Sequence, residues 1–471
     1  MPVPLTLDPA SPEPLVAQIV QGLSQAIASR SWRPGSRTPS IRAFARTHGV
    51  STSTVVEAYD RLVAAGLLTA RRGSGFFVTD PGRGEVRSVP AREHVAQAAI
   101  DGDWLLRNVY ERSAAGIHAG CGWLPDTWHD VDAVGKGLRK LALHPKGLIG
   151  YGPPKGHEPL RQQLTRQLAE LEIEAPPAQI LLTHGASQGL DLVARRLSQP
   201  GDTVFVDDPG YSNLLSALRL RGLNLVGVPM TPTGPDIPTL ERLLAEHAPR
   251  LYFTNTQLQN PTGASYSAAA AFQVLRLAER HDFLVVEDNV SADLVPGRSI
   301  TLAGADQLRR VIYVGSFSKA IAPGLRVGFL AAEPGLLEEL VYFKLVSGMS
   351  TPGVNECLVH AIFMEGHVRK HLEHLRDRLA KAQERTCRRL ESAGFTLFFE
   401  PRAGMFVWAK PSARVSDSLP LAQRALSQGI LLAPGHLFRP DQSPSPWLRF
   451  NVVYCDNDRL FHYMEEALRE R

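Results

Sequence analysis

The sequence predicts a two-part fold, in which a small winged helix-turn-helix head is joined to a large α/β body with a mostly parallel sheet. Short helical patterns with a tight link open the chain, apolar runs alternate with helical patterns farther on, and basic charge is concentrated near the N-terminus. We expect a head over residues 1–80, a linker over 81–114 and a body over 115–471. With 44% hydrophobic residues, a chain of 471 residues has enough apolar material for large buried cores.

The head opens with two helical patterns. Apolar residues recur every four positions from Leu15 to Ile27, which predicts a first helix that ends near Arg30. Ser40 is placed to cap a short second helix that stops at Gly49. Because a third helical pattern follows almost at once, the pair is typical of a helix-turn-helix.

The third helix and a hairpin complete the head. Thr54 and Glu57 have the spacing of a capping box, and Gly66 ends the helix. Residues 67–78 predict two short strands around a Gly-Ser-Gly turn, which would form a wing. The apolar face of the third helix consists of Val55, Tyr59, Leu62 and Val63.

The charge distribution separates the head from the body. Between Arg30 and Thr79, eight arginines stand against Glu57 and Asp60, a net charge of +6, whereas the whole chain carries +4. Positive charge beside a recognition-helix pattern favours binding to the phosphates of double-stranded DNA, with base edges contacted by the polar helix start. The alternative is a helix-turn-helix that serves as a protein-interaction module.

The head resembles the GntR-type winged helix in three segments, Pro39–Arg42, Val50–Val55 and Arg72–Val78. In that family an arginine commonly follows the serine of the turn, whereas this chain has Thr52. The resemblance and the charge pattern together indicate these DNA-binding residues: Arg37, Arg42, Ser51, Ser53, Thr54 and Gly75.

Residues 80–90 are polar and turn-forming, which predicts a flexible boundary. Residues 92–112 are compatible with a helix that docks on the body. No apolar run is long enough to span a bilayer and no signal-peptide pattern is present, so we expect a cytoplasmic protein without membrane association. The four cysteines lack paired spacing, which predicts reduced thiols and no metal site.

The body contains apolar runs that alternate with helical patterns, which predicts buried strands with crossover helices. In such sheets, ligands bind at the carboxyl ends of the strands. The strands are expected at 180–182, 203–206, 250–253, 283–286 and 311–314.

The last of these strands leads into a loop that carries Lys319. Ser316 and Ser318 precede this lysine and Arg326 follows it, which is the set that a phosphorylated aldehyde requires: an amine for a Schiff base, and hydroxyls and a guanidinium for the phosphate. The segment resembles the lysine signature of fold-type I pyridoxal-phosphate enzymes. The resemblance implies that Lys319 holds pyridoxal 5'-phosphate as an aldimine, with Ser316, Ser318 and Arg326 around the phosphate.

Other strand exits resemble the same family. Ala186 and Ser187 lie at a strand-to-helix turn where free backbone N–H groups bind phosphate. Asp288 matches the carboxylate that pairs with the pyridine nitrogen and keeps it protonated, so that the ring can withdraw electrons. The resemblance therefore makes Lys319 and Asp288 the catalytic pair.

Four further residues match family positions. Asn260, in Asn-Pro-Thr-Gly, matches the residue that hydrogen-bonds the phenolic oxygen of the cofactor, and Tyr211 matches the aromatic residue stacked on its ring. Tyr151 matches a tyrosine that reaches the phosphate in a neighbouring subunit, which implies a homodimer. Arg449 matches the arginine that binds a substrate carboxylate by a two-pronged bond.

A winged helix followed by an aminotransferase-like body, with its small C-terminal α+β subdomain, is similar to the MocR-type subfamily of GntR regulators. This resemblance implies a DNA-binding transcription regulator whose body senses pyridoxal phosphate, or a small amino compound, through the aldimine on Lys319. One position departs from the pattern, because Asn289, Val290 and Ser291 follow Asp288 where a tyrosine is usual. The alternatives are an aminotransferase with an accessory DNA-binding head, which the missing tyrosine disfavours, and a dimerisation scaffold with a vestigial site.

Overall fold

The computed structural model describes residues 5–9, 11–29, 31–71, 74–79, 116–297, 300–412 and 415–469. The chain divides into two compact units between Gln97 and Ala98. The predicted linker and its helix over 92–112 lie outside the described residues, as do Arg30, Arg72 and Gly73. The predicted domain boundaries at 80 and 115 therefore stay predictions.

The head unit is a winged helix-turn-helix. Gly49 adopts the left-handed conformation, with φ 68°, and so lets the chain leave the second helix and enter the third within a few residues. The two strands pair antiparallel, with Leu68 opposite Val78. The elements of the head are α1 (Leu15–Ala28), α2 (Ile41–His48), α3 (Thr52–Ala64), β1 (Leu68–Arg71) and β2 (Gly75–Val78).

The core of the head lies between α1 and α3. Ile19 and Leu23 of α1 and Val55 and Tyr59 of α3 are fully buried. The Tyr59 hydroxyl donates to the carbonyl of Pro39 at 3.1 Å, so this buried polar group is satisfied and fixes the segment before α2. The apolar stripes that the sequence predicts for the two helices are the ones that pack.

The predicted capping box of the third helix is wrong. The helix begins at Thr52, and the extended residue Ser51 is its N-cap, with Oγ accepting from the backbone N–H of Thr54 at 3.1 Å. Thr54 therefore lies inside the helix. Glu57 instead accepts from Arg61 one turn later, at 2.7 Å.

The large sheet of the body is mostly parallel, as predicted. Its strand order is β3-β10-β9-β8-β7-β4-β5-β6. The central strands β5, β4, β7, β8 and β9 are mutually parallel, whereas β10 is antiparallel to both of its neighbours. The strands are β3 (Ile180–Thr183), β4 (Thr203–Asp208), β5 (Asn224–Thr231), β6 (Gly234–Pro235), β7 (Leu251–Thr254), β8 (Leu284–Asp288), β9 (Val311–Ser316) and β10 (Gly328–Ala331).

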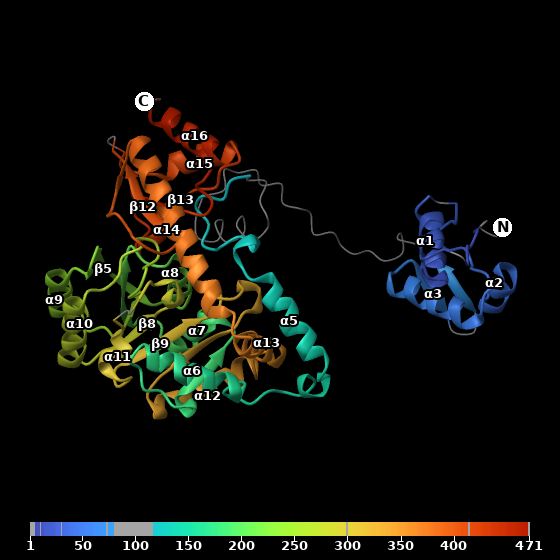
Figure 1. The fold of residues 1–471 in the computed structure, drawn as a ribbon, viewed down its shortest axis with the longest axis horizontal. Helices are drawn as coiled ribbons and strands as arrows, with labels where there is room; N and C mark the ends of the chain where they lie inside the picture. The colour runs from blue at the N-terminus through green and yellow to red at the C-terminus, as the bar shows by residue number, and fades with distance from the viewer. Residues whose placement is uncertain are drawn as a thin grey trace. The chain divides into compact units, whose positions relative to one another are not determined.

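Helices cover both faces of this sheet, because its strands are apolar on both sides. In β4, Val204 and Val206 belong to one buried cluster and Phe205 to the other. The first cluster includes residues of α7, α8 and α12, and the second includes residues of α6, α9, α10, α11 and α13 (Figure 1). Their bounds are α5 (Val131–Ala142), α6 (Glu158–Glu170), α7 (Gly185–Leu197), α8 (Ser212–Leu220), α9 (Ile237–Glu246), α10 (Ala268–His281), α11 (Leu302–Asp306), α12 (Pro334–Gly348) and α13 (Gly353–Met364).

Short 3-10 helices occur in the connections of the body. They are η1 (Asp126–Trp128), η2 (Pro145–Leu148), η3 (Pro177–Gln179), η4 (Ala292–Leu294), η5 (Pro323–Leu325) and η6 (Gly435–Phe438).

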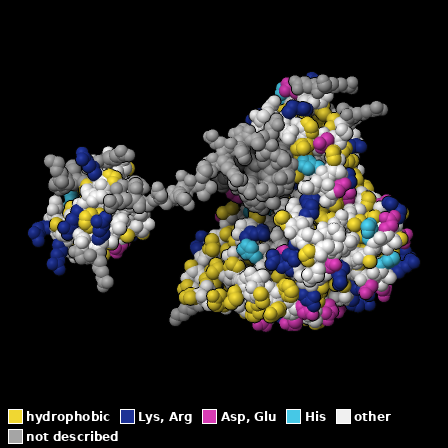
Figure 2. All heavy atoms as spheres, turned by 180° about the vertical axis from the view of Figure 1, so that it is seen from behind, with side chains coloured by type: hydrophobic (Ala, Val, Ile, Leu, Met, Phe, Trp, Pro, Cys, Tyr) yellow, Lys and Arg dark blue, Asp and Glu magenta, His cyan; other side chains and the backbone are white. Residues whose placement is uncertain are grey.

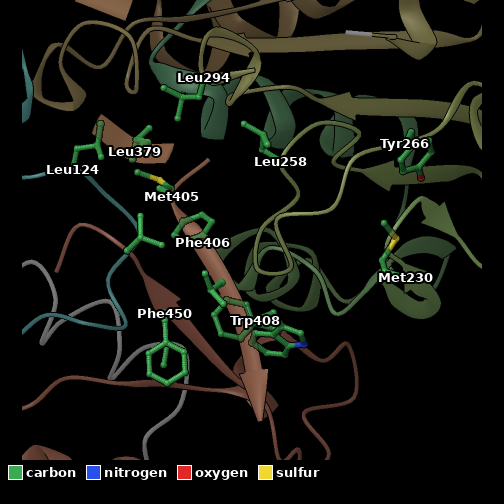
Figure 3. Packing of buried hydrophobic residues seen from close by; sticks show 14 of the residues in the cluster. Leu124, Met230, Leu258, Tyr266, Leu294, Leu379, Met405, Phe406, Trp408 and Phe450 are labelled. Carbon is green, nitrogen blue, oxygen red and sulfur yellow. The ribbon is translucent and has the colours of Figure 1, made fainter. Parts of the chain in front are cut away.

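The C-terminal part forms the expected small α+β subdomain. Its antiparallel sheet has the order β11-β12-β14-β13, and Figure 3 shows Phe406 and Trp408 of β12 in the packed cluster. Arg449 lies on β14, with Trp408 as its partner in register. The elements are α14 (Val368–Ser392), α15 (Leu419–Ser427), α16 (Asp458–Arg469), β11 (Phe395–Leu397), β12 (Phe406–Pro411), β13 (Ala433–Pro434) and β14 (Leu448–Asn451).

Within the described part of the chain, none of the helices has the length and apolarity needed to cross a membrane.

The surface of the body has an apolar region. Hydrophobic side chains gather on the edge of the body where Figure 1 places α5 and α13 (Figure 2). Large apolar residues exposed on α5, α12, α13 and nearby loops are Val131, Leu138, Leu143, Ile149, Tyr151, Tyr342, Val346, Met349, Val354 and Met364.

Candidate functional site

Lys319 lies three residues after the end of β9, at the carboxyl edge of the large sheet. Its ammonium group donates to the carbonyl of Gly122 at 2.6 Å. Burial, together with the charges of Arg449 and Arg326, lowers the pKa of Lys319 to about 8, although Cys121 and Asp288 act in the opposite direction. A larger fraction of this amine is therefore neutral near pH 7, as attack on an aldehyde requires.

The residues expected around a phosphate are brought together beside Lys319. Gly185 opens α7 with φ 71°, and a Cβ at this glycine would lie 2.4 Å from the Arg326 guanidinium. A Cβ at Gly328 would lie 2.6 Å from the backbone nitrogen of Ala186, so this strand packs directly against the helix start. Among the described residues, no side chain accepts from the N–H groups of the first turn of α7, which leaves them available to an anion; Gln188 accepts from the N–H of His184 just before the helix.

The two serines of the lysine loop are linked to each other. The Ser316 hydroxyl donates to that of Ser318 at 3.0 Å, and the backbone N–H of Ser318 donates to Ser316 Oγ at 3.1 Å. Ser187 is exposed in the first turn of α7. Together with Arg326 and the start of α7, these groups form a cradle suited to a phosphate dianion.

Asp288 ends β8 and is 4% exposed. Its Oδ1 atom is buried and has no hydrogen-bond partner among the described residues. Burial raises the pKa of Asp288 to about 7, and nearby Asp207 adds to the increase, whereas the Val290 N–H and Lys319 oppose it. A buried carboxylate oxygen without a partner fits a cationic N–H group such as a protonated pyridine.

Arg449 and Asn260 form one hydrogen-bonded unit. Arg449 donates through Nη1 to Asn260 Oδ1 at 2.8 Å and through Nη2 to the carbonyl of Gly120 at 2.7 Å. Because Oδ1 accepts from the arginine, the amide NH₂ of Asn260 remains a donor toward a ligand. The Arg449 guanidinium lies between the rings of Phe406 and Phe438, 4.7 and 4.8 Å from their centroids, and burial lowers its pKa to about 10.

The two tyrosines lie in different surroundings. Tyr211 is half-buried before α8, where its hydroxyl accepts from Asn213 Nδ2 at 3.1 Å, and it is near enough to Arg449 to oppose the lowering of that residue's pKa by burial. Tyr151 is 86% exposed on the loop before α6. The fold therefore brings Tyr211 to the Lys319 site and leaves Tyr151 pointing to solvent. The Asp208–Pro209 and Asn260–Pro261 peptide bonds of this region are cis.

Sequence reasoning missed the segment from Gly120 to Gly122. Its carbonyls accept from both Arg449 and Lys319, and a Cβ at Gly120 would meet the backbone nitrogen of Ala433 at 2.3 Å. The two closely spaced glycines were a signal for this close backbone approach. Sequence reasoning also missed Asp207, which is buried and accepts from Tyr252, and whose pKa burial raises to about 6.

The candidate DNA-binding residues lie on the head. Arg37, Arg42 and Ser53 are exposed, as are Thr52 and Gly75. Figure 2 shows arginine side chains on the displayed face of this unit. Three hydroxyls are engaged with one another, because Ser51 Oγ caps α3 and lies 2.7 Å from both Ser53 Oγ and Thr54 Oγ1.

Comparisons with known proteins divide the chain as the fold does. Residues 15–78 match the family described as bacterial regulatory proteins, gntR family, and residues 124–465 match aminotransferase class I and II.

Relatives with both parts are similar over nearly the whole chain. An uncharacterized HTH-type transcriptional regulator, YdfD of Bacillus subtilis, is 28% identical over 95% of this chain and 94% of its own. The probable rhizopine catabolism regulatory protein MocR of Rhizobium meliloti is 28% identical over 91% and 88%. The 2-aminoadipate transaminase of Thermus thermophilus is 30% identical but covers only 71% of this chain and 85% of its own.

Solved structures similar to the body include aminotransferases. The α-aminoadipate aminotransferase LysN from Thermus thermophilus, complexed with N-(5'-phosphopyridoxyl)-L-leucine, is 27% identical with a TM-score of 0.68, covering 77% of this chain and 92% of its own. Kynurenine aminotransferase from Pyrococcus horikoshii, in complex with PMP, is 25% identical with a TM-score of 0.72, covering 82% and 98%.

Proposed function

The chain belongs to the aminotransferase class I and II family and, with its GntR head, to the MocR-type regulators, and from this premise we propose that it is a transcription regulator that senses an amino compound or pyridoxal phosphate. Pyridoxal 5'-phosphate is its cofactor. One observation carries the proposal: the same chain contains a DNA-binding head and a cofactor site. This site retains its cofactor-binding residues but lacks the usual tyrosine after Asp288.

The residues of the body fit this cofactor. Lys319 would hold the aldehyde carbon, and the start of α7 with Ser316, Ser318 and Arg326 would hold the phosphate. The unpartnered Oδ1 of Asp288 would accept from the pyridine nitrogen. When bound, the cofactor supplies an electron-withdrawing ring and an aldehyde carbon that can be passed from one amine to another.

Two residues of this site would recognise the effector. Arg449 donates to two neutral acceptors, Asn260 and Gly120, while its buried Nε has no partner among the described residues. A carboxylate that enters the site can therefore form a charge-assisted pair with this guanidinium. Tyr211 would cover one side of the cofactor ring. The proposed effector is therefore a small amino compound with a carboxylate, or pyridoxal phosphate itself.

A homodimer is part of the proposal. Exposed apolar residues gather on α5, α12 and α13, and a patch of this kind favours association with another chain. Tyr151 lies on the loop between α5 and α6 and is 86% exposed. We assign it to the cofactor phosphate of the partner subunit.

The head is the part of the proposed regulator that binds DNA. GntR heads bind DNA, and the exposed arginines Arg37 and Arg42 supply the positive charge that phosphates require. A ligand acts as a signal only if it favours one of two arrangements of the protein. We propose that occupancy at Lys319 biases how the paired heads engage their operator.

The second candidate is a working aminotransferase with an accessory head. It is favoured by the retention of Lys319, Asp288 and Arg449 in one site, and by the similarity to a 2-aminoadipate transaminase. It is disfavoured by the residues after Asp288, because Val290 and Ser291 stand two and three residues on, where family members usually carry the tyrosine that tunes the cofactor.

One preparation of holoprotein distinguishes the two functions. We would measure turnover of a panel of amino acids with 2-oxoglutarate, and the affinity for DNA from upstream of its own gene against shuffled DNA. Specific DNA binding without sustained turnover supports the regulator. Sustained turnover without specific DNA binding supports the aminotransferase and overturns the regulator.

A further inference from the structure

Lys344 of α12 is a buried lysine that the proposed function does not use. It is 1% exposed, and its ammonium group donates to the carbonyls of Pro154 and Leu182, both at 2.9 Å, and lies 3.4 Å from Thr351 Oγ1. Pro154 belongs to the loop that carries Tyr151, and Leu182 belongs to β3, which leads into α7. One side chain therefore joins the tyrosine loop to the strand that enters the phosphate cradle.

Glu356 of α13 completes this buried cluster. It is 2% exposed and accepts from the backbone N–H of His157 at 2.8 Å and from the Thr351 hydroxyl. The charge of Glu356 raises the pKa of Lys344 but does not offset its burial, which lowers that pKa to about 8. Lys344 and Glu356 thus hold the loop from both of its sides, through Pro154 and through His157.

The rest of the loop is fixed by its backbone. The N–H of Gly156 donates to Pro153 at 2.8 Å, and the N–H of Leu182 donates to the Lys155 carbonyl at 3.0 Å. Gly156 has φ 91°, and a Cβ there would lie 2.6 Å from the Leu182 side chain. The segment 153–157 is therefore tightly held, whereas Tyr151, two residues before it, is exposed.

Burying a lysine and a glutamate is unfavourable, and apolar residues of similar volume often stabilise such a position better. Here Lys344 donates to a loop carbonyl, that of Pro154, and to a carbonyl of β3, that of Leu182, and an apolar side chain would make neither hydrogen bond. The cluster is therefore suited to fixing the loop in one conformation.

We propose that Lys344 is a positioning residue that acts across the dimer, because it fixes the loop that presents Tyr151 to the cofactor phosphate of the partner subunit. This inference rests on the proposed homodimer and on the proposed role of Tyr151. It assigns a function in trans to a residue that lies outside the cofactor site of its own chain.

Hybrid dimers test the direction of this effect. Two chains with different affinity tags are coexpressed, and Lys319→Ala leaves each hybrid with one site that can attach the cofactor. In the first hybrid, Lys344→Met is in the same chain as Lys319→Ala. In the second, Lys344→Met is in the chain that retains Lys319. Attachment is measured by titration of pyridoxal phosphate, followed by borohydride reduction and quantification of the labelled chain.

The proposal expects about tenfold weaker attachment in the first hybrid, where the loop that serves the working site is altered, and attachment within about twofold of the unaltered hybrid in the second. The reverse pattern, equal weakening in both hybrids, or no change in either would overturn it. A general loss of structure cannot produce the expected asymmetry. Lys381→Met, which removes an exposed lysine of α14 outside the apolar patch, is the matched control and should leave both hybrids unchanged.

Two further variants keep the test decisive. If Lys344→Met does not fold, Glu356→Gln weakens the same cluster with little change of volume. Its effect on attachment must also be confined to the first hybrid. Tyr151→Phe in the same two hybrids tests the premise. If Tyr151→Phe does not weaken attachment at the partner's site, the proposed dimer arrangement fails. If Tyr151→Phe weakens it but the Lys344 and Glu356 variants do not, only the proposed role of Lys344 fails.

Discussion

Arg449 Nη1 donates to Asn260 Oδ1 at 2.8 Å, which joins a residue of β14 in the small subdomain to the turn that follows β7 of the large sheet. The same guanidinium donates to Gly120, so three separate parts of the body meet at one side chain. An effector carboxylate that engages Arg449 would therefore change a contact between the subdomain and the sheet. This contact gives a physical route from ligand to conformation.

We expect Arg449→Met to weaken the response to carboxylate-bearing amino compounds by about 10- to 100-fold, because a charge-assisted two-pronged bond is lost. Cofactor attachment at Lys319 should change little. The measurement is the absorbance change of the bound cofactor with amino acids, each paired with the amine that lacks the α-carboxylate. An equal loss for acids and amines would contradict the assignment, and Arg449→Lys, which keeps the charge but not the fork, should retain part of the preference.

The raised pKa of Asp288, about 7, predicts a pH dependence of the cofactor-free protein. The folded state holds a proton that the unfolded state releases near pH 4, so this group's contribution to stability is fully present below about pH 4 and is lost as pH rises toward 7. Asp288→Asn removes this pH-dependent contribution to stability. The wild type should therefore lose unfolding free energy relative to the variant between pH 5 and pH 8, by about 2.5 kcal/mol.

Denaturant titration of both cofactor-free proteins at the two pH values measures this difference. A pH-independent difference would mean that Asp288 is ionised throughout. The neighbouring Asp207, whose pKa burial also raises, is present in both proteins, so the comparison reports Asp288 together with its interaction with Asp207.

Ser291→Tyr should increase transamination. A phenol near the phenolic oxygen of the cofactor would restore the hydrogen bond that family members have and facilitate proton transfer, with a rise of at least about tenfold in the single-turnover rate. Ser291→Phe adds the ring without the hydroxyl and is the matched control. If both variants leave the rate unchanged, the missing tyrosine does not limit turnover.

Arg42→Ala should weaken DNA binding and lower the slope of log affinity against log salt by about one unit, because one phosphate contact is lost. Arg42 is exposed at the start of α2. Arg369→Ala removes an arginine that is also exposed but lies in the body, and it should leave both quantities unchanged. An unaltered salt slope for Arg42→Ala would place this residue outside the DNA interface.

Much of the fold could be predicted from the sequence, because its strongest signals are local. The runs that form β4, β7, β8 and β9 are apolar on both faces, and a polar residue stands in the sequence at or directly after the end of each strand. Lys319 and Asp288 could therefore be assigned to one edge of the sheet before their geometry was known. The winged helix could be assigned similarly, from Ser40, Gly49 and the arginine cluster.

The parts that were missed depend on contacts between distant segments. β10 is only four residues long and pairs antiparallel with β3 and β9, which no periodicity of its own indicates. The role of Gly120 arises from the approach of Ala433, more than three hundred residues later. The capping box at Thr54 was misassigned because Ser51, one turn earlier, is an equally good cap, and only the backbone conformation decides between them.

The most direct test of the central claim is the affinity of the protein for DNA from upstream of its own gene, measured by fluorescence anisotropy at fixed salt, with pyridoxal phosphate present and removed. Lys319→Ala is measured in parallel. The account predicts that the affinity or the stoichiometry changes when the cofactor, or an amino compound bound with it, occupies Lys319, and that Lys319→Ala binds DNA but does not respond. Specific binding that is identical in every state of the Lys319 site would contradict the claim that this site controls the head.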